Sequence, residues 1–203
     1  LYDRCDVVIA VSPWLKEFLE EKGMKKPIVT IPNGIDTSLF RPDADKGEFR
    51  KVFKIPRGRP IVLFMGRLQH KKDPKTFLRA AIKSKSDAVF VIAGKGELET
   101  DLRKMARGKE NIIFAGFLPE RLVCKAYSAA DIFVLPSEME TQALVLIEAM
   151  ASETACISTD VGIARDVVDN EFLFENGNSD ELAGKIDSLL EDKKKIKSLG
   201  KKG

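Results

Sequence analysis

The sequence predicts an α/β fold built on a doubly wound, mostly parallel sheet, and two observations lead to this prediction. Short apolar blocks recur along the chain without polar alternation, as expected for strands that are covered on both faces. Segments with the apolar spacing of amphipathic helices lie between most of these blocks. Strand–helix alternation of this kind is typical of parallel sheets with helical crossovers.

The expected elements follow one another from the start of the chain. In the first helix, SPWLKEFLEEKG, Ser12 can cap the amino terminus, Pro13 suits the first turn and Gly23 ends the helix. The expected strands are VVIAV, IVTI, IVLFM, AVFVIA, NIIFAG, DIFVLP, ACIST and FLF. Further helices are expected in DPKTFLRAAIKS, ELETDLRKMARG, ERLVCKAYSAA and SDELAGKIDSLLED.

We divide the chain of 203 residues into three parts. A strand–helix–strand lead-in covers about residues 1–32, and an irregular connection rich in Pro, Gly, Asn and Asp covers 33–59. The main, Rossmann-like body covers 60–203, and its lysine-rich end is expected to be a solvated helix face. Because the chain begins abruptly at the approach to a strand, we expect a fragment of a longer protein.

The composition argues against several classes of protein. With 34 basic and 31 acidic side chains the net charge is +3, which lacks the basic excess of a nucleic-acid binder. No apolar run approaches the roughly 18 residues of a spanning helix, and we expect no signal peptide. Cys5, Cys124 and Cys156 lie far apart, which favours buried thiols in a reducing, cytoplasmic compartment over a disulfide or metal site.

A basic loop is expected after the strand IVLFM, where a ligand of an open α/β sheet would lie. Gly66 ends the strand, and Arg67, Lys71 and Lys72 follow it in GRLQHKKD. Basic groups at this position can face an anion, most plausibly a phosphate. The alternative is that they are ordinary loop charges, and position alone does not decide between the two.

Two further strand ends carry candidate residues. In GKGELE, Gly94 and Gly96 would let the backbone approach a ligand closely, although on these residues alone we favour a tight turn. In GFLP, Phe117 would either pack on a flat base or seal the core, and we favour the core.

The stretch PSEMETQALVLIEAMAS places two carboxylates around an apolar run whose spacing predicts a helix. In a helix, Glu140 and Glu148 would lie about 12 Å apart along the axis. The helix amino terminus between them offers free N–H groups to an anion, so the layout fits a nucleoside diphosphate sugar. The alternative is a capping charge at Glu140 and a satisfied structural carboxylate at Glu148. A half-buried glutamate is costly without hydrogen bonds, and we therefore favour a functional pair.

Taken in order, the motifs IPNGIDTSLFRP, GRLQHKKD, GKGELE, ADIFVLPS with ETQALVLIEAMAS, and STDVGIARDVV resemble the retaining glycosyltransferases of family 4. The resemblance is to the carboxyl-terminal, donor-binding half of these enzymes and covers nearly the whole chain. It implies one half of a two-domain GT-B hexosyltransferase, with an acceptor domain that is absent from this chain.

The resemblance also implies residue roles. Arg67 and Lys72 would bind the donor diphosphate and neutralise the leaving group without a metal or other cofactor, and Glu140 would contact the transferred sugar. Glu148 would bind the ribose. The turns at Gly94–Gly96 and Phe117–Leu118 would flank the base. The implied catalytic residues are Arg67, Lys72 and Glu140, and the implied donor-binding residues are Gly66, Gly94, Gly96, Phe117, Leu118, Ala143, Leu144 and Glu148.

The implied partners are a nucleotide-sugar donor and an acceptor sugar, lipid or other glycan bound through the absent domain, with peripheral membrane association left open. The fragment alone would transfer little, because a family histidine lies in that domain. His70, the single histidine here, is expected at the surface.

Several positions depart from the family pattern, which keeps two alternatives open. The departures are Thr141, Gln142 and Ala143 in place of Gly, Phe and Gly, Glu153 and Ala155 in place of Gly and Pro, and Asp166 in place of Glu. Less glycine means less freedom for close backbone approach. The alternatives are a degenerate nucleotide-sugar binding or regulatory module and, at lower rank, a nucleotide-sugar epimerase.

Overall fold

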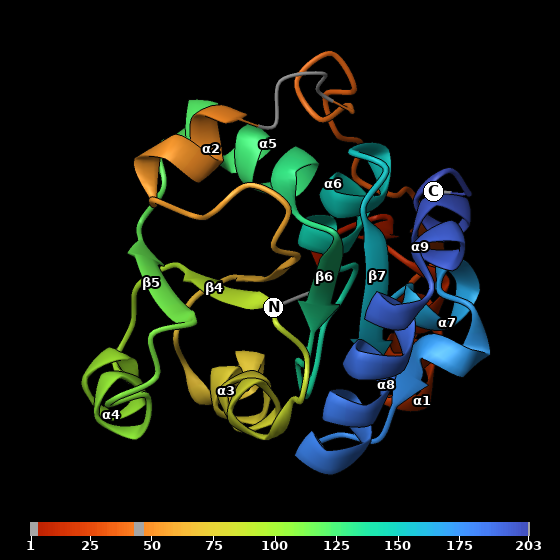
Figure 1. Ribbon diagram of the computed structural model, residues 1–203. Coiled ribbons are helices and arrows are strands. Elements are labelled where there is room, and N and C mark those ends of the chain that lie inside the picture. Colours follow the sequence, from red (N-terminus) through yellow and green to blue (C-terminus); the bar gives the residue numbers. More distant parts are fainter. Residues whose placement is uncertain (1–3, 43–46, 203) are drawn as a thin grey trace.

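The computed structural model describes residues 4–42 and 47–202 and shows an α/β body with a small lead-in beside it (Figure 1). The body is a six-stranded, all-parallel sheet with strand order β5-β4-β3-β6-β7-β8, which confirms the predicted fold class. Its strands are β3 (Ile61–Met65), β4 (Val89–Ala93), β5 (Ile112–Gly116), β6 (Ile132–Leu135), β7 (Ala155–Thr159) and β8 (Leu173–Phe174).

Helices cover both faces of this sheet. On one side lie α2 (Gly47–Val52), α5 (Glu120–Ala129) and α6 (Leu144–Ala151), and on the other α3 (Pro74–Lys83) and α4 (Glu99–Met105) (Figure 1). The remaining elements are η2 (His70–Lys72), α7 (Ala164–Val167), η3 (Asn170–Phe172), α8 (Ser179–Glu191) and α9 (Lys193–Gly200). No helix of the described ranges is long and apolar enough to cross a bilayer.

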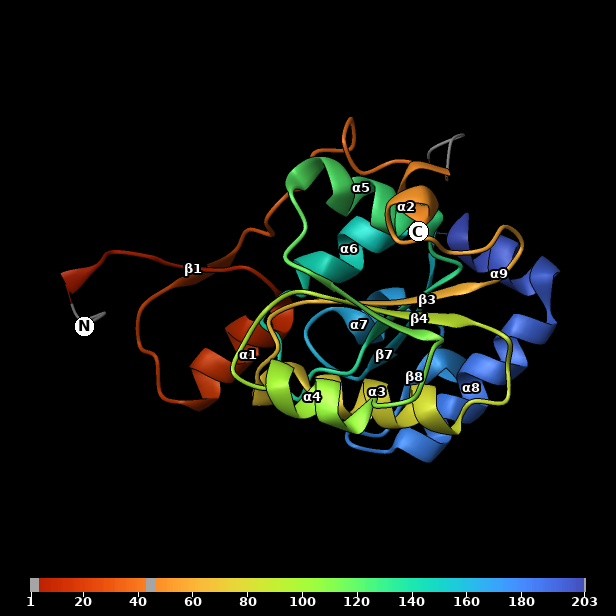
Figure 2. The ribbon, with the colours of Figure 1, turned by 60° about the vertical axis from the view of Figure 1, so that its left-hand side comes forward.

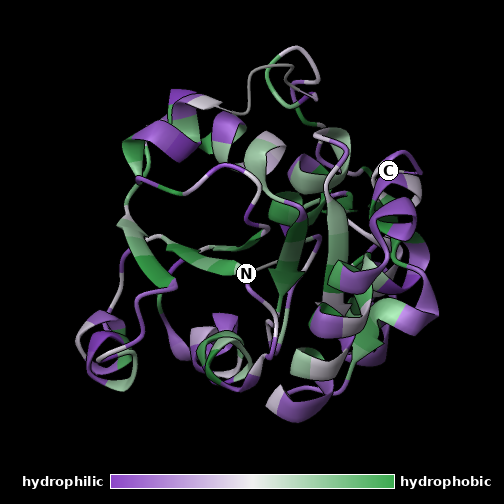
Figure 3. Cartoon of the chain, viewed as in Figure 1, coloured by the Kyte–Doolittle hydropathy of each residue, from purple (hydrophilic) through white to green (hydrophobic). Residues whose placement is uncertain are grey.

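The core lies between the sheet and these helix layers, and its strands are the most apolar parts of the chain (Figure 3). All five residues of β4 are buried, so this strand can form only where helices shield both of its faces. Aromatic rings fill the space between sheet and helices: the ring of Tyr127 on α5 lies 5.6 Å from that of Phe133 on β6, centroid to centroid. Burying one large apolar side chain stabilises a fold by about 1.5–3 kcal/mol.

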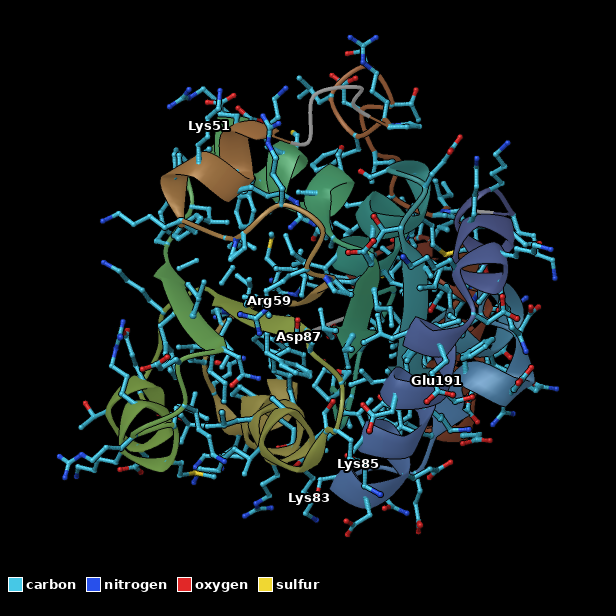
Figure 4. The ribbon with its side chains drawn as sticks, viewed as in Figure 1. Lys51, Arg59, Lys83, Lys85, Asp87 and Glu191 are labelled. Carbon is cyan, nitrogen blue, oxygen red and sulfur yellow. The ribbon has the colours of Figure 1, made fainter. Side chains whose placement is uncertain are left out.

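The strand order reverses between β3 and β6, and this reversal determines where a ligand can bind. Chain segments leave the carboxyl ends of β3 and β6 toward opposite sides of the sheet, which opens space between the two loops. At the other edge of the sheet, surface charges pair among themselves. Arg59 and Asp87, which precede β3 and β4, form such a pair, with 2.9 Å between Nη2 and Oδ1 (Figure 4).

The lead-in forms a separate two-stranded parallel sheet from β1 (Val8–Ala10) and β2 (Ile28–Thr30), connected by α1 (Pro13–Glu21). Figure 2 shows this segment reaching away from the main body. Ser12 caps α1 as expected, because its hydroxyl accepts a hydrogen bond from Leu15 N at 3.1 Å.

Two sequence-based expectations need correction here. The connection at 33–59 is not irregular throughout, because α2 forms within it and buries Phe49 completely; the ring of Phe49 packs 4.8 Å from that of Phe53. Residues 43–46 of that connection lie outside the described part. The three thiols are not all buried either: Cys156 is, whereas Cys5 and Cys124 are half-exposed.

Candidate functional site

The structure brings Lys72 and Glu140 into direct contact at the switch point of the sheet. Lys72 ends η2, which follows β3, and its Nζ lies 2.6 Å from Glu140 Oε1 in the loop after β6. The hydroxyl of Ser137 donates to the same carboxylate oxygen at 2.8 Å. The two loops are also joined through the backbone, because Glu138 N donates to Lys71 O at 3.0 Å.

This ion pair is shielded but still reachable from solvent. The side chain of Glu140 is 9% exposed and that of Lys72 is 24% exposed. The hydrogen bonds from Lys72 and Ser137 both reach Oε1 of Glu140 and do not use its second carboxylate oxygen. A cation and a carboxylate held side by side in this way can contact a phosphate and a hydroxyl of one ligand.

Glu148 lies on α6, as predicted, and its partner is Tyr127 on α5. The Tyr127 hydroxyl donates to Glu148 Oε2 at 2.8 Å, while Glu148 itself stays half-buried. Burial raises the pKa of the Glu148 carboxyl above its ordinary value, and the Tyr127 hydrogen bond partly opposes this rise. Burial raises the pKa of Tyr127 well above its usual range, and the neighbouring Glu148 raises this pKa further. The Tyr127 hydroxyl therefore stays protonated and acts as a donor.

The amino terminus of α6 lies between the two glutamates, as the sequence predicted. The helix begins at Leu144, directly after Ala143, whose backbone is left-handed at φ 65 and ψ 60. A left-handed alanine costs about 1–2 kcal/mol, which is the reason glycine is usual at such positions. Ala143 stands where the family pattern has glycine, so the loop keeps the shape of a glycine turn without the glycine.

The loops after β3 and β4 are packed backbone to backbone at Gly94 and Gly96. A Cβ at Gly94 would lie 1.9 Å from Gly66 O, and one at Gly96 would lie 2.3 Å from Leu68 O. The two glycines therefore permit one loop to approach the other. This close contact is a structural reason for both glycines, and their role toward a donor stays a prediction.

A pocket of about 240 Å³ nevertheless opens beside these loops. Five predicted residues line it, namely Gly66, Arg67, Gly94, Phe117 and Leu118, whereas Gly96 does not. The preference for Phe117 as a core residue was wrong, because its side chain is 74% exposed and Leu118 is the buried one. The left-handed φ of 67° at Gly116 turns the chain at this point.

His70 and Arg67 both lie at the surface, which was the expectation for His70. His70 is exposed, and Arg67 is exposed at the rim of the pocket. Across residues 4–42 and 47–202, no cluster of three or more His, Cys, Asp and Glu side chains has the arrangement of metal ligands.

Sequence reasoning missed three groups that organise the site: Ser137, Tyr127 and Gln142. Ser137 had a local signal, since it precedes Glu140 by three residues and carries a hydroxyl. Tyr127 and Gln142 had none, because their partners lie 21 and 109 positions away along the chain.

Comparison with known proteins identifies the family. The family model described as Glycosyl transferases group 1 matches residues 45–203, and the model described as Glycosyltransferase Family 4 matches residues 1–39. The chain belongs to the glycosyl transferases group 1 family. The sheet and helices described above are the Rossmann-like half of the GT-B fold.

Two relatives illustrate the range of the family. A UDP-Gal:alpha-D-GlcNAc-diphosphoundecaprenol alpha-1,3-galactosyltransferase from Escherichia coli is 31% identical over 179 residues, which cover 82% of this chain and 46% of that protein. A GDP-mannose-dependent alpha-mannosyltransferase from Mycolicibacterium smegmatis is 33% identical over 168 residues, covering 83% and 43%. The chain thus spans less than half the length of either relative.

Two solved structures are similar over nearly the whole chain. Sucrose-phosphate synthase from Thermosynechococcus elongatus has a TM-score of 0.89 and 28% identity, covering 98% of this chain and 53% of that one. Anabaena HepE in complex with UDP-glucose has a TM-score of 0.89 at 22% identity, covering 98% and 58%, which is a likeness of fold.

Proposed function

We propose that this chain is the donor-binding domain of a retaining hexosyltransferase that uses a nucleoside diphosphate sugar. The observation that carries the proposal is the contact between Lys72 and Glu140 beside the start of α6, with Glu148 further along the same helix. Names of relatives support a nucleotide-sugar donor and differ in its base, UDP in one and GDP in another. We therefore propose the donor class without choosing the base or the sugar.

In this proposal the charges of the site act on the departing diphosphate. When the bond between the anomeric carbon and the diphosphate oxygen breaks, negative charge grows on that oxygen. Lys72, Arg67 and the amino terminus of α6 would stabilise this charge more strongly in the transition state than in the bound donor. Glu140 would bind the transferred sugar. An acceptor hydroxyl would attack the anomeric carbon from the face that the diphosphate leaves, and its proton would pass to the departing diphosphate oxygen.

The nucleoside would occupy the remaining two features of the site. Glu148, held by Tyr127, can accept hydrogen bonds from ribose hydroxyls. The exposed ring of Phe117 stands at a pocket of about 240 Å³ and offers a flat apolar surface to a base. The acceptor would bind to a further domain of a longer protein. We place that protein in the cytoplasm, which fits the thiols of Cys124 and Cys156.

The test is calorimetric titration of the chain with UDP, GDP, ADP and their sugar conjugates. Lys72→Ala and Glu148→Ala should each weaken binding of the preferred nucleotide by about 1.5–3 kcal/mol, since each removes a charged hydrogen-bonding group. Lys83→Ala is the matched control. Lys83 (Figure 4) is the last residue of α3, and it makes a 2.8 Å ion pair with Asp180. Unchanged affinity in both site variants would contradict the assigned roles.

One observation bears on the alternative of a degenerate binding module. Ala143 and Glu153, which replace family glycines, both have left-handed backbones, at φ 65 and φ 55. Both positions thus have the backbone conformation that glycine adopts most readily, which favours a working site. Transfer or donor hydrolysis by the longer protein would support the transferase, whereas donor binding without either reaction would support the module.

A further inference from the structure

Gln142 joins the loop between Glu140 and α6 to Asn33, the residue that directly follows the lead-in, through both polar atoms of its side-chain amide. Its Oε1 accepts hydrogen bonds from Asn33 N at 3.0 Å and from Asn33 Nδ2 at 2.7 Å. Its Nε2 donates to Asn33 O at 2.9 Å. Gln142 is only 3% exposed, whereas Asn33 is exposed, so a buried amide is fixed to a residue at the surface of the lead-in's end.

A second contact fixes the neighbouring residue to the same segment. The hydroxyl of Ser12, at the start of α1, donates to Thr141 O at 2.5 Å. Gly162 also packs close to this loop, since an added Cβ there would come within 3.2 Å of Glu140 Cβ. The stretch between Glu140 and α6 is therefore fixed at Thr141 by Ser12 and at Gln142 by Asn33.

The loop needs such support because its own sequence does not favour its shape. The left-handed backbone of Ala143 is disfavoured by about 1–2 kcal/mol and persists only where the surroundings determine it. The family pattern has phenylalanine where this chain has Gln142, so these three hydrogen bonds depend on a residue that departs from the pattern.

We propose that Gln142 is a positioning residue, which sets the loop from Glu140 to Leu144 against Asn33 so that the start of α6 meets the distal phosphate of the donor. This inference rests on the proposed function and adds to it the residue that determines diphosphate recognition. It also links the donor site to the lead-in, the part of the chain that a different family model matches.

The test compares nucleoside diphosphate and monophosphate binding by the chain and its variants. For whichever of UDP, GDP or ADP binds best, Gln142→Ala should lower diphosphate affinity on the order of tenfold, as expected for a few lost hydrogen bonds. Affinity for the corresponding monophosphate should change by less than about twofold, because it lacks the phosphate that the loop would meet. Gln142→Met keeps the side-chain volume, and it should give the same result if the alanine variant folds poorly.

Two further variants distinguish positioning from general stability. Asn33→Ala removes one of the three hydrogen bonds and keeps the two to the backbone, so its loss of diphosphate affinity should be smaller. Asp187→Ala is the matched control, since Asp187 accepts hydrogen bonds from Lys85 N at 2.9 Å and from the Ser84 hydroxyl far from the site. This control should lower the unfolding temperature without altering the ratio of diphosphate to monophosphate affinity.

The outcomes separate this inference from the function on which it rests. Equal losses for diphosphate and monophosphate, or no loss for either, would overturn the positioning role while nucleotide binding stands. A wild-type chain that is folded and binds none of the nucleotides would overturn the proposed function and this inference together.

Discussion

The carboxyl group of Glu148 is placed for binding at a cost to stability. Burial raises its pKa above the ordinary 4.5, and the Tyr127 hydroxyl only partly offsets the effect. Between pH 4.5 and the raised value, the folded chain holds more protons than the unfolded chain. The contribution of Glu148 to the free energy of unfolding therefore falls as the pH rises through this window.

We predict that Glu148→Gln removes this dependence while it abolishes most nucleotide affinity. Glutamine carries no charge, and its oxygen can still accept the Tyr127 hydrogen bond. The free energy of unfolding of the variant relative to wild type should rise between pH 4 and pH 8 in urea titrations. Glu110→Gln, at an exposed turn position, serves as the control. A difference that stays constant with pH would contradict the prediction.

Residue-level prediction succeeded where the signal was local. The sequence predicted Arg67 and Lys72 just after a strand and Glu148 on a helix, and the structure has them there. The carboxyl ends of the strands form the edge of the sheet where a ligand would lie. The sequence could not supply Tyr127 as the partner of Glu148, because that contact joins two helices across 21 positions. Nor could it show that Ala143 keeps a left-handed backbone, since an alanine has no preference for that conformation.

At the scale of elements, the loops after β3 and β4 behave as one unit. Gly66 N donates to Ala93 O at 3.0 Å, and Leu68 N donates to Lys95 O at 2.9 Å, so each loop fixes the other. The glycines that permit this approach also place Gly66, Arg67 and Gly94 around the proposed base pocket. Disturbing the contact should therefore affect both stability and binding.

We predict that Gly94→Ala destabilises the chain by more than about 3 kcal/mol, because its Cβ would lie 1.9 Å from Gly66 O and one loop must move. Gly108→Ala is the matched control. Gly108 also has a positive φ, +80, but nothing lies within 4 Å of an added Cβ, so only about 1–2 kcal/mol of backbone strain is expected. Urea unfolding measures both, and equal losses would show that the loops can separate freely.

Elements were predicted well where strand and helix patterns alternate and poorly where short segments depend on their neighbours. The apolar blocks from β3 to β7 are long enough to show strands buried on both faces. The helix α2 has only six residues, and it is stabilised by the burial of Phe49 against the core. Its sequence lies among turn-forming residues, so a local pattern could not distinguish it from a loop.

At the scale of the whole molecule, the small sheet of the lead-in is covered on one face only. The face of the β1–β2 sheet that includes Val8 and Ala10 is buried, whereas Ile9 is 60% exposed and Val29 is 47% exposed. A pair of strands with one open apolar face is marginally stable by itself. The apolar blocks VVIAV and IVTI predicted these strands, but the expectation that both faces are covered is wrong for Ile9 and Val29. The separation of the two strands from the main sheet depends on topology, which a local apolar pattern does not reveal.

We predict that the longer protein proposed above covers this open face. In the chain of 203 residues, Ile9→Lys should change the free energy of unfolding by no more than about 0.5 kcal/mol, because the side chain is already solvated. In the longer protein the same substitution should cost about 1.5–3 kcal/mol, since it would remove buried apolar surface and bury a charge. Val52→Lys, 50% exposed on α2, should have little effect in either protein. Urea unfolding of both proteins decides the matter: a cost for Ile9→Lys that is equally small in both would mean that the face stays open to solvent.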